Sequence, residues 1–447
     1  MAESRYRSQG SAEVEAQRRA AIPVTVAVVG GGVAGISCAC ELADAGIGVV
    51  LLESQKHLGG RVSSFQDHAS GLILDNCQHV LLGCCHEAID FLSRLGSLCQ
   101  IDFADTTSII GNLGEKLRIS CSPLPAPFHL LPSILATGYL LTSEKFTLSR
   151  MLMSMMLHSP GKTTTASDYL KALSCPEGVT ERLIEPVIVS ALNERAGEAS
   201  AKYARMALLE ALVKSRDGYR LGVPKTPQSQ WLGEAAKQFL SDRECEVRTG
   251  AKVKYVQISD GRVRAVELAG EEMLKVDYCV CAVPPDNLVK MGLEPWGGER
   301  LVWRPIVSAH LFYEEPVPEF EPACVVNEPF QWVFCKHADV GYVQAVASAA
   351  EDLINKNKDE TLELARRAVE KVEPVLTKVA LKRGIVYKGR RATFSTLACD
   401  AHRPPAQTPV RNLFLAGDWT DTHWPATIES AVRSGHAAAR TVMMSIQ

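Results

Sequence analysis

The glycine-rich run Gly30-Gly31-Gly32-Val33-Ala34-Gly35 constrains the fold of this chain more than any other feature. It matches the pattern G-x-G-x-x-G and stands between an apolar, mostly β-branched segment at 24–29 and a segment at 34–45 with few helix breakers. A second apolar segment follows at 47–52. This order of strand, glycine turn, helix and strand predicts a βαβ unit in a parallel, Rossmann-like sheet.

The same spacing predicts what the turn binds. Gly30 permits a tight turn, and Gly35 permits close packing of the helix on the strand. Gly32 lets backbone amides approach a pyrophosphate, where the helix N-terminus adds positive potential. The first helical residues, Val33 and Ala34, therefore belong to the expected cofactor contacts.

Glu53 stands at the end of the second predicted strand, about twenty residues beyond the glycines. A carboxylate in this position can accept hydrogen bonds from ribose hydroxyls, and its charge disfavours a 2′-phosphate. Ser54, the next residue, is included in the expected site. With strand, helix and carboxylate in register, the sequence favours dinucleotide binding over a tight turn without a ligand.

A second glycine loop, Leu58-Gly59-Gly60-Arg61, favours FAD over NAD. We expect Gly60 and Arg61 to reach the far side of the pyrophosphate, which suits a flavin threaded deep into the protein. The alternative is an ordinary turn with a solvated arginine.

The C-terminal segment repeats the order of strand, loop and helix. A strand at 413–416 leads to Gly417 and Asp418, whose carboxylate can hydrogen-bond the ribitol of a flavin. The following helix is expected to start beside the flavin ring near Thr427 and Ile428, where its dipole would stabilise negative charge on the reduced ring. The alternative is a helix that only closes the fold.

Composition excludes several function classes. The 48 Lys and Arg residues nearly balance the 51 Asp and Glu residues, so the net charge of −3 does not favour a nucleic-acid surface. The 14 cysteines include no C-x-x-C pair, so we expect reduced thiols and no metal site. No apolar run is long enough to span a membrane, although 128–158 is rich in Leu, Ile and Met. We expect a cytoplasmic protein in which this stretch covers an apolar pocket, packs in the core or contacts the inner face of the membrane.

At these motifs the chain resembles the flavin-containing amine oxidase and phytoene desaturase superfamily. More narrowly, the strings LDNCQHVLLGCC, PLPAPFHLLPSIL, SALNERAGEASAKYA, PFQWVF and LAGDWTDTHWPATIESAVRSG resemble its hydroxysqualene dehydroxylase branch. The chain departs from that pattern at Cys77 and His423, where glycine is expected, and at Glu194, where threonine is expected.

The resemblance implies an α/β fold in which a Rossmann-like FAD-binding domain of the GR2 type is interleaved with a mixed α+β substrate domain. We expect residues 23–115, 231–295 and 406–447 to form the FAD-binding domain. Residues 116–230 and 296–405 would form the substrate domain, and 1–22 a flexible leader. The resemblance adds Asn76 and Val253 to the expected FAD contacts.

The implied activity is that of an FAD-dependent oxidoreductase that removes the hydroxyl of hydroxysqualene, a C30 isoprenoid alcohol, and yields squalene for hopanoid or triterpenoid synthesis. Such chemistry needs a proton donor and an electron donor, and the sequence does not identify the latter. Asp421 is the favoured proton donor, kept protonated by an apolar site, with His79 and His423 as alternatives.

The allylic cation formed in such a reaction needs shelter. Aromatic side chains could supply it or could simply belong to the core; the candidates are Trp332, Phe334, Trp419 and Trp424. Two other readings remain open. One is oxidation on the same fold by a carotenoid-type desaturase or an amine oxidase, and the other is a carrier of prenylated cargo without enzymatic activity.

Overall fold

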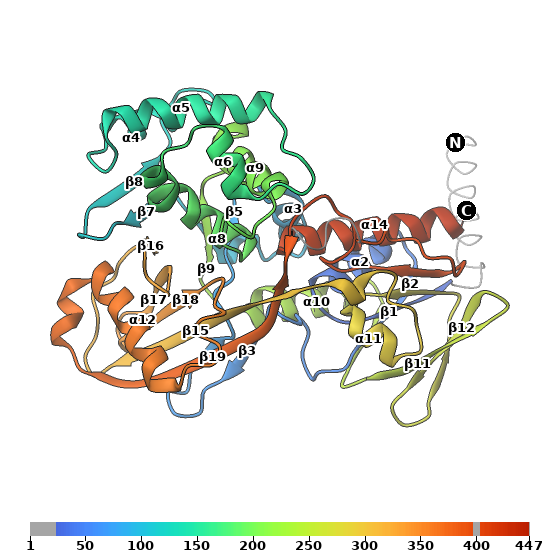
Figure 1. Ribbon diagram of the computed structural model, residues 1–447. Helices are drawn as coiled ribbons and strands as arrows, with labels where there is room; N and C mark the ends of the chain where they lie inside the picture. Colours follow the sequence, from blue (N-terminus) through green and yellow to red (C-terminus); the bar gives the residue numbers. More distant parts are fainter. Residues whose placement is uncertain (1–23, 397–402, 447) are drawn as a thin grey trace, which may run out of the picture.

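The computed structural model describes residues 24–396 and 403–446, which form the two interleaved halves shown in Figure 1. The leader expected at 1–22 lies outside the described residues. One half is built on a five-stranded sheet and the other on a seven-stranded sheet with a group of helices above it.

The five-stranded sheet is parallel and has the order β10-β2-β1-β14-β20. Its strands are β1 (Thr25–Val29), β2 (Gly48–Glu53), β10 (Glu246–Thr249), β14 (Tyr278–Cys281) and β20 (Leu413–Leu415). The predicted βαβ unit is confirmed, because β1 pairs with β2 through the helix α2 (Val33–Asp44).

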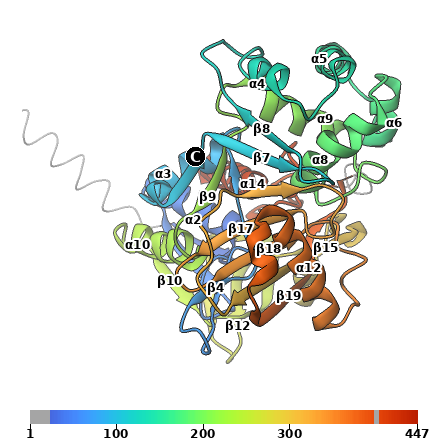
Figure 2. The same cartoon turned by 90° about the vertical axis from the view of Figure 1, so that its left-hand side faces the viewer.

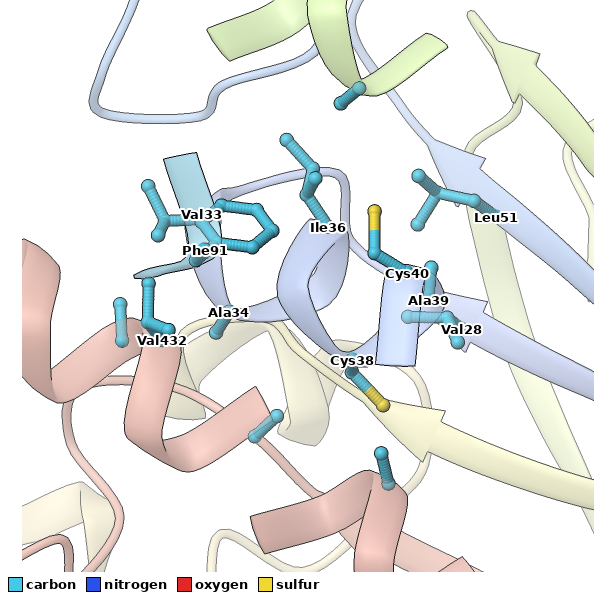
Figure 3. Close-up of a cluster of buried hydrophobic side chains, with 14 of the residues drawn as sticks. Val28, Val33, Ala34, Ile36, Cys38, Ala39, Cys40, Leu51, Phe91 and Val432 are labelled. Atoms are coloured by element: carbon cyan, nitrogen blue, oxygen red, sulfur yellow. The ribbon is translucent and has the colours of Figure 1, made fainter. Parts of the chain in front are cut away.

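Both faces of this sheet are covered, as continuous apolar strands require. Val26 and Val28 point to the helix side, where α2 packs with α3 (His86–Arg94), α10 (Ala235–Ser241) and α14 (Ile428–Ile446), as Figure 3 shows for part of this cluster. Ala27 and Val29 point to the opposite side, where a small antiparallel sheet packs. That sheet has the order β11-β12-β13 and comprises Val253–Ser259, Arg262–Leu268 and Met273–Lys275.

The chain makes a tight hairpin turn at Asp260-Gly261, between β11 and β12. Ser259 of β11 pairs with Arg262 of β12, so the turn contains only two residues. Both have positive φ, 55° and 68°, which is the geometry that matches the twist of a two-residue hairpin.

The seven-stranded sheet has the order β19-β15-β18-β17-β16-β7-β8 and is antiparallel except where β16 pairs with β7. Its strands are β7 (Thr106–Ile110), β8 (Lys116–Ser120), β15 (Trp303–Tyr313), β16 (Ala323–Val325), β17 (Trp332–His337), β18 (Tyr342–Ala347) and β19 (Leu381–Phe394). One face packs on α12 (Lys358–Val372). The other face packs on residues of the first half, among them Leu74 and Cys77.

The described residues also form two smaller sheets. They are β3-β4 (Ser64–Gln66 and Ile73–Asp75) and β5-β9-β6 (Leu81–Leu82, Leu221–Pro224 and Ile101–Ala104). Because β7 belongs to the seven-stranded sheet, the change from one half to the other falls before residue 106 by sheet membership. The predicted division at 115 remains a prediction.

The segment from 131 to 214 is mainly helical. Its helices are α4 (Leu131–Ala136), α5 (Thr142–Leu157), α6 (Ala166–Ala172), α7 (Glu177–Val179), η2 (Thr180–Ile184), α8 (Glu185–Leu192), α9 (Ala201–Leu209) and η3 (Glu210–Lys214). The other short helices are η1 (Leu98–Gln100), η4 (Ser229–Glu234), α11 (Pro285–Lys290), η5 (Gly298–Arg300) and η6 (Pro374–Lys378). Within the described residues, no helix combines the length and apolarity needed to cross a membrane. Every cysteine in the described part of the chain is a free thiol.

Candidate active site

The first glycine loop joins the end of β1 to the start of α2, and the three glycines of its G-x-G-x-x-G pattern have different surroundings. A Cβ on Gly35 would lie 1.8 Å from the carbonyl oxygen of Gly30, and one on Gly30 would lie 2.6 Å from that of Ala282. A Cβ on Gly32 would meet no atom within 4 Å, and no side chain caps the N-terminus of α2. The loop therefore leaves an open cradle at Gly32, in front of a helix N-terminus, which fits a pyrophosphate.

Glu53 lies at the end of β2 beside this loop and is buried. One carboxylate oxygen accepts the backbone N–H of Gly31 at 2.7 Å. The other accepts the hydroxyl of Ser54 at 3.0 Å and the N–H of Gln55 at 2.7 Å. The carboxylate thus holds the glycine loop in place. Its remaining lone pairs can accept hydrogen bonds from a donor such as a ribose hydroxyl.

Val253 opens β11 on the other side of Glu53. The backbone N–H of Ala251 donates to the carbonyl of Glu53 at 2.8 Å, which ties the start of β11 to the end of β2. Val253 is buried, and it packs in the cluster that contains Val50 and Leu52 of β2. The structure therefore brings this predicted cofactor contact next to the predicted ribose carboxylate.

The second glycine loop lies directly against the first. The N–H of Gly59 donates to the carbonyl of Gly31 at 2.8 Å, and a Cβ on Gly60 would lie 3.1 Å from the Cα of Gly32. Gly60 also has a φ of +61°, a conformation that favours glycine. The two loops form one continuous surface around the Gly32 cradle.

Arg61 links three distant parts of the chain. Its guanidinium pairs with the buried carboxylate of Asp418 at 2.5 Å and donates to the carbonyl of Ala392 in β19 at 2.8 Å. The structure therefore brings the predicted arginine of the second loop to the predicted ribitol carboxylate of the C-terminal segment.

The C-terminal segment is fixed by hydrogen bonds at both ends of its loop. Gly417, with a φ of +146°, donates its N–H to the hydroxyl of Ser434 at 2.8 Å. Thr427 precedes α14, which begins at Ile428, and its hydroxyl accepts the N–H of Ser430 at 3.2 Å. Because a threonine N-cap satisfies an amide of the first turn, the helix begins here, at the position near Thr427 and Ile428 that the sequence predicts.

Arg403 is a site residue that the sequence analysis missed. Its buried guanidinium donates to the carbonyls of Asp418 at 2.8 Å and Trp424 at 2.6 Å, and to the hydroxyls of Tyr203 and Thr422. It holds the loop between β20 and α14 in shape. An arginine beside two prolines carries no recognisable motif, so only the fold reveals this role.

Asp421 and His423 lie on that loop but not in the apolar site that we expected for Asp421. The Asp421 side chain is 43% exposed, and its carboxylate faces Nδ1 of His423 at 3.1 Å. The His423 side chain is 81% exposed. The expectation of an apolar enclosure for Asp421 is therefore wrong. His423 has a φ of +61°, which explains why glycine is expected at this position.

His79, by contrast, is partly buried in the loop after β4. Its Nε2 lies 3.4 Å from the carbonyl oxygen of Arg61, and burial lowers the pKa of its imidazole. Asn76 anchors the start of this loop, because its side chain donates to the hydroxyl of Ser63 at 2.6 Å. The loop therefore places His79 beside the arginine that contacts Asp418.

Lys336 in β17 is a second residue that sequence analysis missed. Its ammonium donates to the side-chain carbonyl of Gln78 at 2.6 Å and lies 3.9 Å from the carboxylate of Asp75. Burial lowers the pKa of Lys336, while Asp75 opposes that shift. The lysine stands in an alternating strand pattern, where a solvent-facing side chain would be the ordinary expectation.

The four candidate aromatic residues separate into two groups. Trp332 and Phe334 stack with ring centroids 6.0 Å apart on the face of the seven-stranded sheet that packs on Cys77. Trp419 is buried in the core and donates to the carbonyl of Val283. Trp424 lies under the guanidinium of Arg433. Only the first two share a surface that faces the His79 loop.

Glu194, where threonine is expected, is fully buried. It pairs with Arg304 at 3.2 Å and accepts both the N–H and the hydroxyl of Thr396. Glu194 thus joins the end of α8 to the seven-stranded sheet through Arg304 of β15. Within the described residues, no group of three or more His, Cys, Asp or Glu side chains could hold a metal ion.

Comparisons with known proteins agree with this site. Residues 33–443 match the family of flavin containing amine oxidoreductases. A hydroxysqualene dehydroxylase of Rhodopseudomonas palustris is 29% identical, over 94% of this chain and 98% of its own length. One from Zymomonas mobilis is 29% identical, over 92% and 97%. A 15-cis-phytoene desaturase of Synechococcus elongatus is 22% identical, over 94% and 95%.

Solved structures give the same fold. A crystal structure of an oxidoreductase from Methanosarcina mazei has a TM-score of 0.70 at 16% identity and covers 94% of this chain and 100% of its own. A putrescine oxidase bound to putrescine also has a TM-score of 0.70, at 17% identity, and covers 95% and 99%. At these identities the likeness concerns the fold alone.

Proposed function

This chain belongs to the family of flavin containing amine oxidoreductases, and we propose that it removes the hydroxyl of hydroxysqualene reductively to give squalene. The protein is an FAD-dependent oxidoreductase. The proposal concerns its substrate and the direction of its reaction.

One observation carries the proposal. The dehydroxylases from three bacteria align with nearly the whole chain at 27–29% identity, whereas the phytoene desaturases align over a similar span at 22–24%. The dehydroxylation would supply squalene to a hopanoid or triterpenoid pathway.

The cofactor would be held by the residues brought together around Gly32. We propose that the amides after Gly32 bind the pyrophosphate, that Glu53 binds ribose and that Asp418 binds ribitol. When bound in its reduced form, FAD supplies the hydride for the carbon that loses oxygen. Arg61 then orients the site, because its guanidinium fixes Asp418 while its own carbonyl fixes His79.

The proton donor is better placed at His79 than at Asp421. The carbonyl of Arg61 can only accept a hydrogen bond, so Nε2 of His79 carries a proton and Nδ1 is the atom that takes up and releases the second one. Burial lowers the pKa of this group, so the protonated form releases its proton readily to a leaving hydroxyl. Asp421 is exposed and faces His423 instead.

The stacked pair Trp332 and Phe334 would exclude water from the reacting carbon and shelter positive charge. Phe334 is buried beside Cys77, two residues before His79, so the aromatic pair and the proposed donor face the same region. The π faces of such rings attract cations. The indole N–H of Trp332 donates to Ser190 at 2.7 Å, which fixes the orientation of the ring.

A desaturase of the carotenoid type is the second candidate. It is favoured by the phytoene desaturases that align with 94–98% of the chain. A carrier of prenylated cargo is disfavoured, because it would not require the open cradle at Gly32 or the acidic residues around it.

Anaerobic incubation of the pre-reduced protein with hydroxysqualene in detergent tests the proposal. We expect squalene to form, with oxidation of the flavin as a second readout. The protein stripped of FAD serves as the control. Desaturation of phytoene by the oxidised protein, without turnover of the alcohol, would assign the chain to the desaturase class instead.

A further inference from the structure

Helix α5 carries apolar side chains on two opposite faces. The inner stripe is buried and comprises Glu144, Leu148, Met151 and Met155. An outer stripe has the same spacing but is shifted by two residues, about 200° around the helix, and comprises Phe146, Arg150, Met153 and Leu157. Phe146 and Leu157 are 74% and 79% exposed. A surface helix normally turns polar residues outward, so an exposed second apolar face indicates that another molecule binds there.

The outer face continues onto α4 and the loops beside it. We define the α4–α5 patch as six side chains that are each at least half exposed: Phe128, Leu135, Leu141, Phe146, Met153 and Leu157. Lys145 of α5 donates to the carbonyls of Leu135 and Thr137, so the two helices are tied together. In Figures 1 and 2 both helices lie at the outer edge of the molecule. Single exposed apolar residues are ordinary, but a contiguous group marks an interaction surface.

Within residues 121–167, the segment that carries the patch, the exposed acidic and basic residues are all basic. From 121 to 167 the sequence contains one acidic residue, Glu144, which is buried and pairs with Arg182 at 2.5 Å. Arg150 lies in the middle of the outer stripe and forms no ion pair with any described residue, and Lys162 follows the helix. An apolar face with basic side chains complements the surface of an anionic membrane.

We propose that the α4–α5 patch docks on an anionic lipid bilayer, with the axis of α5 parallel to the membrane surface. The buried stripe of α5 packs in the same cluster as Ile188 and Leu192 of α8, against which Trp332 also packs. The docking surface thus lies on the outside of the helical cluster against which Trp332 of the proposed aromatic shelter packs. Docking would let the protein take up an isoprenoid that is dissolved in the bilayer, and this purpose rests on the proposed function. The docking itself is independent of the proposed function.

Co-sedimentation of the FAD-loaded full chain with vesicles tests the proposal. The probes are vesicles of phosphatidylglycerol with phosphatidylcholine, and vesicles of phosphatidylcholine alone. We expect binding to the anionic vesicles, and about a tenfold or greater loss of affinity in the double variant Phe146→Ser with Leu157→Ser. The matched control is Val289→Ser with Met273→Ser, at residues that are 55% and 47% exposed in the other half of the molecule. It should bind like the unchanged protein.

A charge variant supplies an independent measurement. Arg150→Glu should weaken binding to anionic vesicles and should reduce its dependence on salt. All variants should keep the flavin spectrum and the unfolding temperature, because the substituted side chains are exposed.

Three results would overturn the proposal: no binding of the unchanged chain to anionic vesicles, equal binding by the double variant, or a lipid-free dimer abolished by that variant, which would assign the face to a second copy. Turnover of hydroxysqualene in detergent separates this proposal from the proposed function. A protein that binds vesicles without such turnover retains the docking surface and loses the proposed substrate.

Discussion

Replacement of Gly32 by alanine separates cofactor binding from folding. The added methyl group would meet no atom of the protein within 4 Å, and the φ of Gly32 is −77°, which alanine adopts without strain. The methyl group would instead occupy the cradle in which we place the pyrophosphate. Gly32→Ala should therefore leave the chain folded and impair FAD binding.

The magnitudes follow from these surroundings. In the protein without FAD, the less favourable N-cap residue and the reduced entropy of the unfolded chain act in opposite directions, each by about 1 kcal/mol or less. In the complex, each lost bond between a backbone amide and the pyrophosphate should cost about 1.5 to 3 kcal/mol, because such bonds are charge-assisted. The Kd for FAD should therefore rise by roughly ten- to a hundredfold for each bond lost.

Gly35→Ala is the matched control, since its methyl group would lie 1.8 Å from the backbone oxygen of Gly30. That atom cannot move without breaking the turn, so this variant should lose thermal stability even without FAD. Flavin fluorescence titration of the stripped protein measures the Kd, and calorimetry measures the unfolding temperature. An unchanged Kd for Gly32→Ala, or a drop in its unfolding temperature like that of Gly35→Ala, would refute the assignment of the cradle.

Three further predictions concern single side chains. Glu53→Ala should weaken FAD binding about tenfold or more by titration, since it removes both a ribose acceptor and the brace on Gly31; unchanged affinity would place the ribose elsewhere. His310 is fully buried, and burial lowers its pKa to about 3, so the imidazole stays neutral in the folded chain. Its contribution to the free energy of unfolding is therefore complete above pH 6.5 and is lost as the pH falls toward 3. Between pH 6.5 and 5, chemical denaturation should show a loss of about 2 kcal/mol that is absent in His310→Gln, and equal slopes in both proteins would contradict this. His79→Ala should keep the flavin spectrum while squalene formation falls by roughly two to four orders of magnitude. The rate of the unchanged enzyme should rise as the pH falls below about 6.5, because burial lowers the pKa of His79 from its ordinary value and the donor must be protonated; if Asp421→Asn loses the rate instead, the donor is Asp421.

Helices and strands whose apolar residues recur at regular spacing could be predicted from the sequence. Strands that form only because they pair with a neighbouring strand could not. The βαβ unit and α12 have local signatures, because their apolar residues recur at the spacing of one strand or one helix face. The strands β7, β16 and β19 were not predicted. Strand β19 is half-exposed and rich in charge, and β16 has three residues, so neither shows a pattern without its neighbour. Their formation depends on the adjacent strands rather than on their own residues.

The cofactor site and the substrate site differ in the same way. Cofactor binding depends on backbone amides and on glycines, and the need for glycine at a tight turn is written into a few consecutive positions, such as Gly30 to Gly35. The expectation that Asp421 is enclosed was wrong for the opposite reason. The exposure of a loop side chain depends on whether distant segments of the chain pack over it, and its own neighbours in the sequence do not show this.

Under the proposed function, substrate recognition at the aromatic pair depends on strand register. Trp332 and Phe334 reach the surface beside Cys77 because β17 pairs with β18 so that Trp332 faces Val346. A shift of one residue in this pairing would turn both rings to the side of α12 and would bring Val333 to the His79 loop. The glycine loops would be unaffected by that shift. Relatives with the same cofactor motifs can thus act on different substrates, and the residues that decide between an alcohol and a polyene should be sought on this face of the seven-stranded sheet.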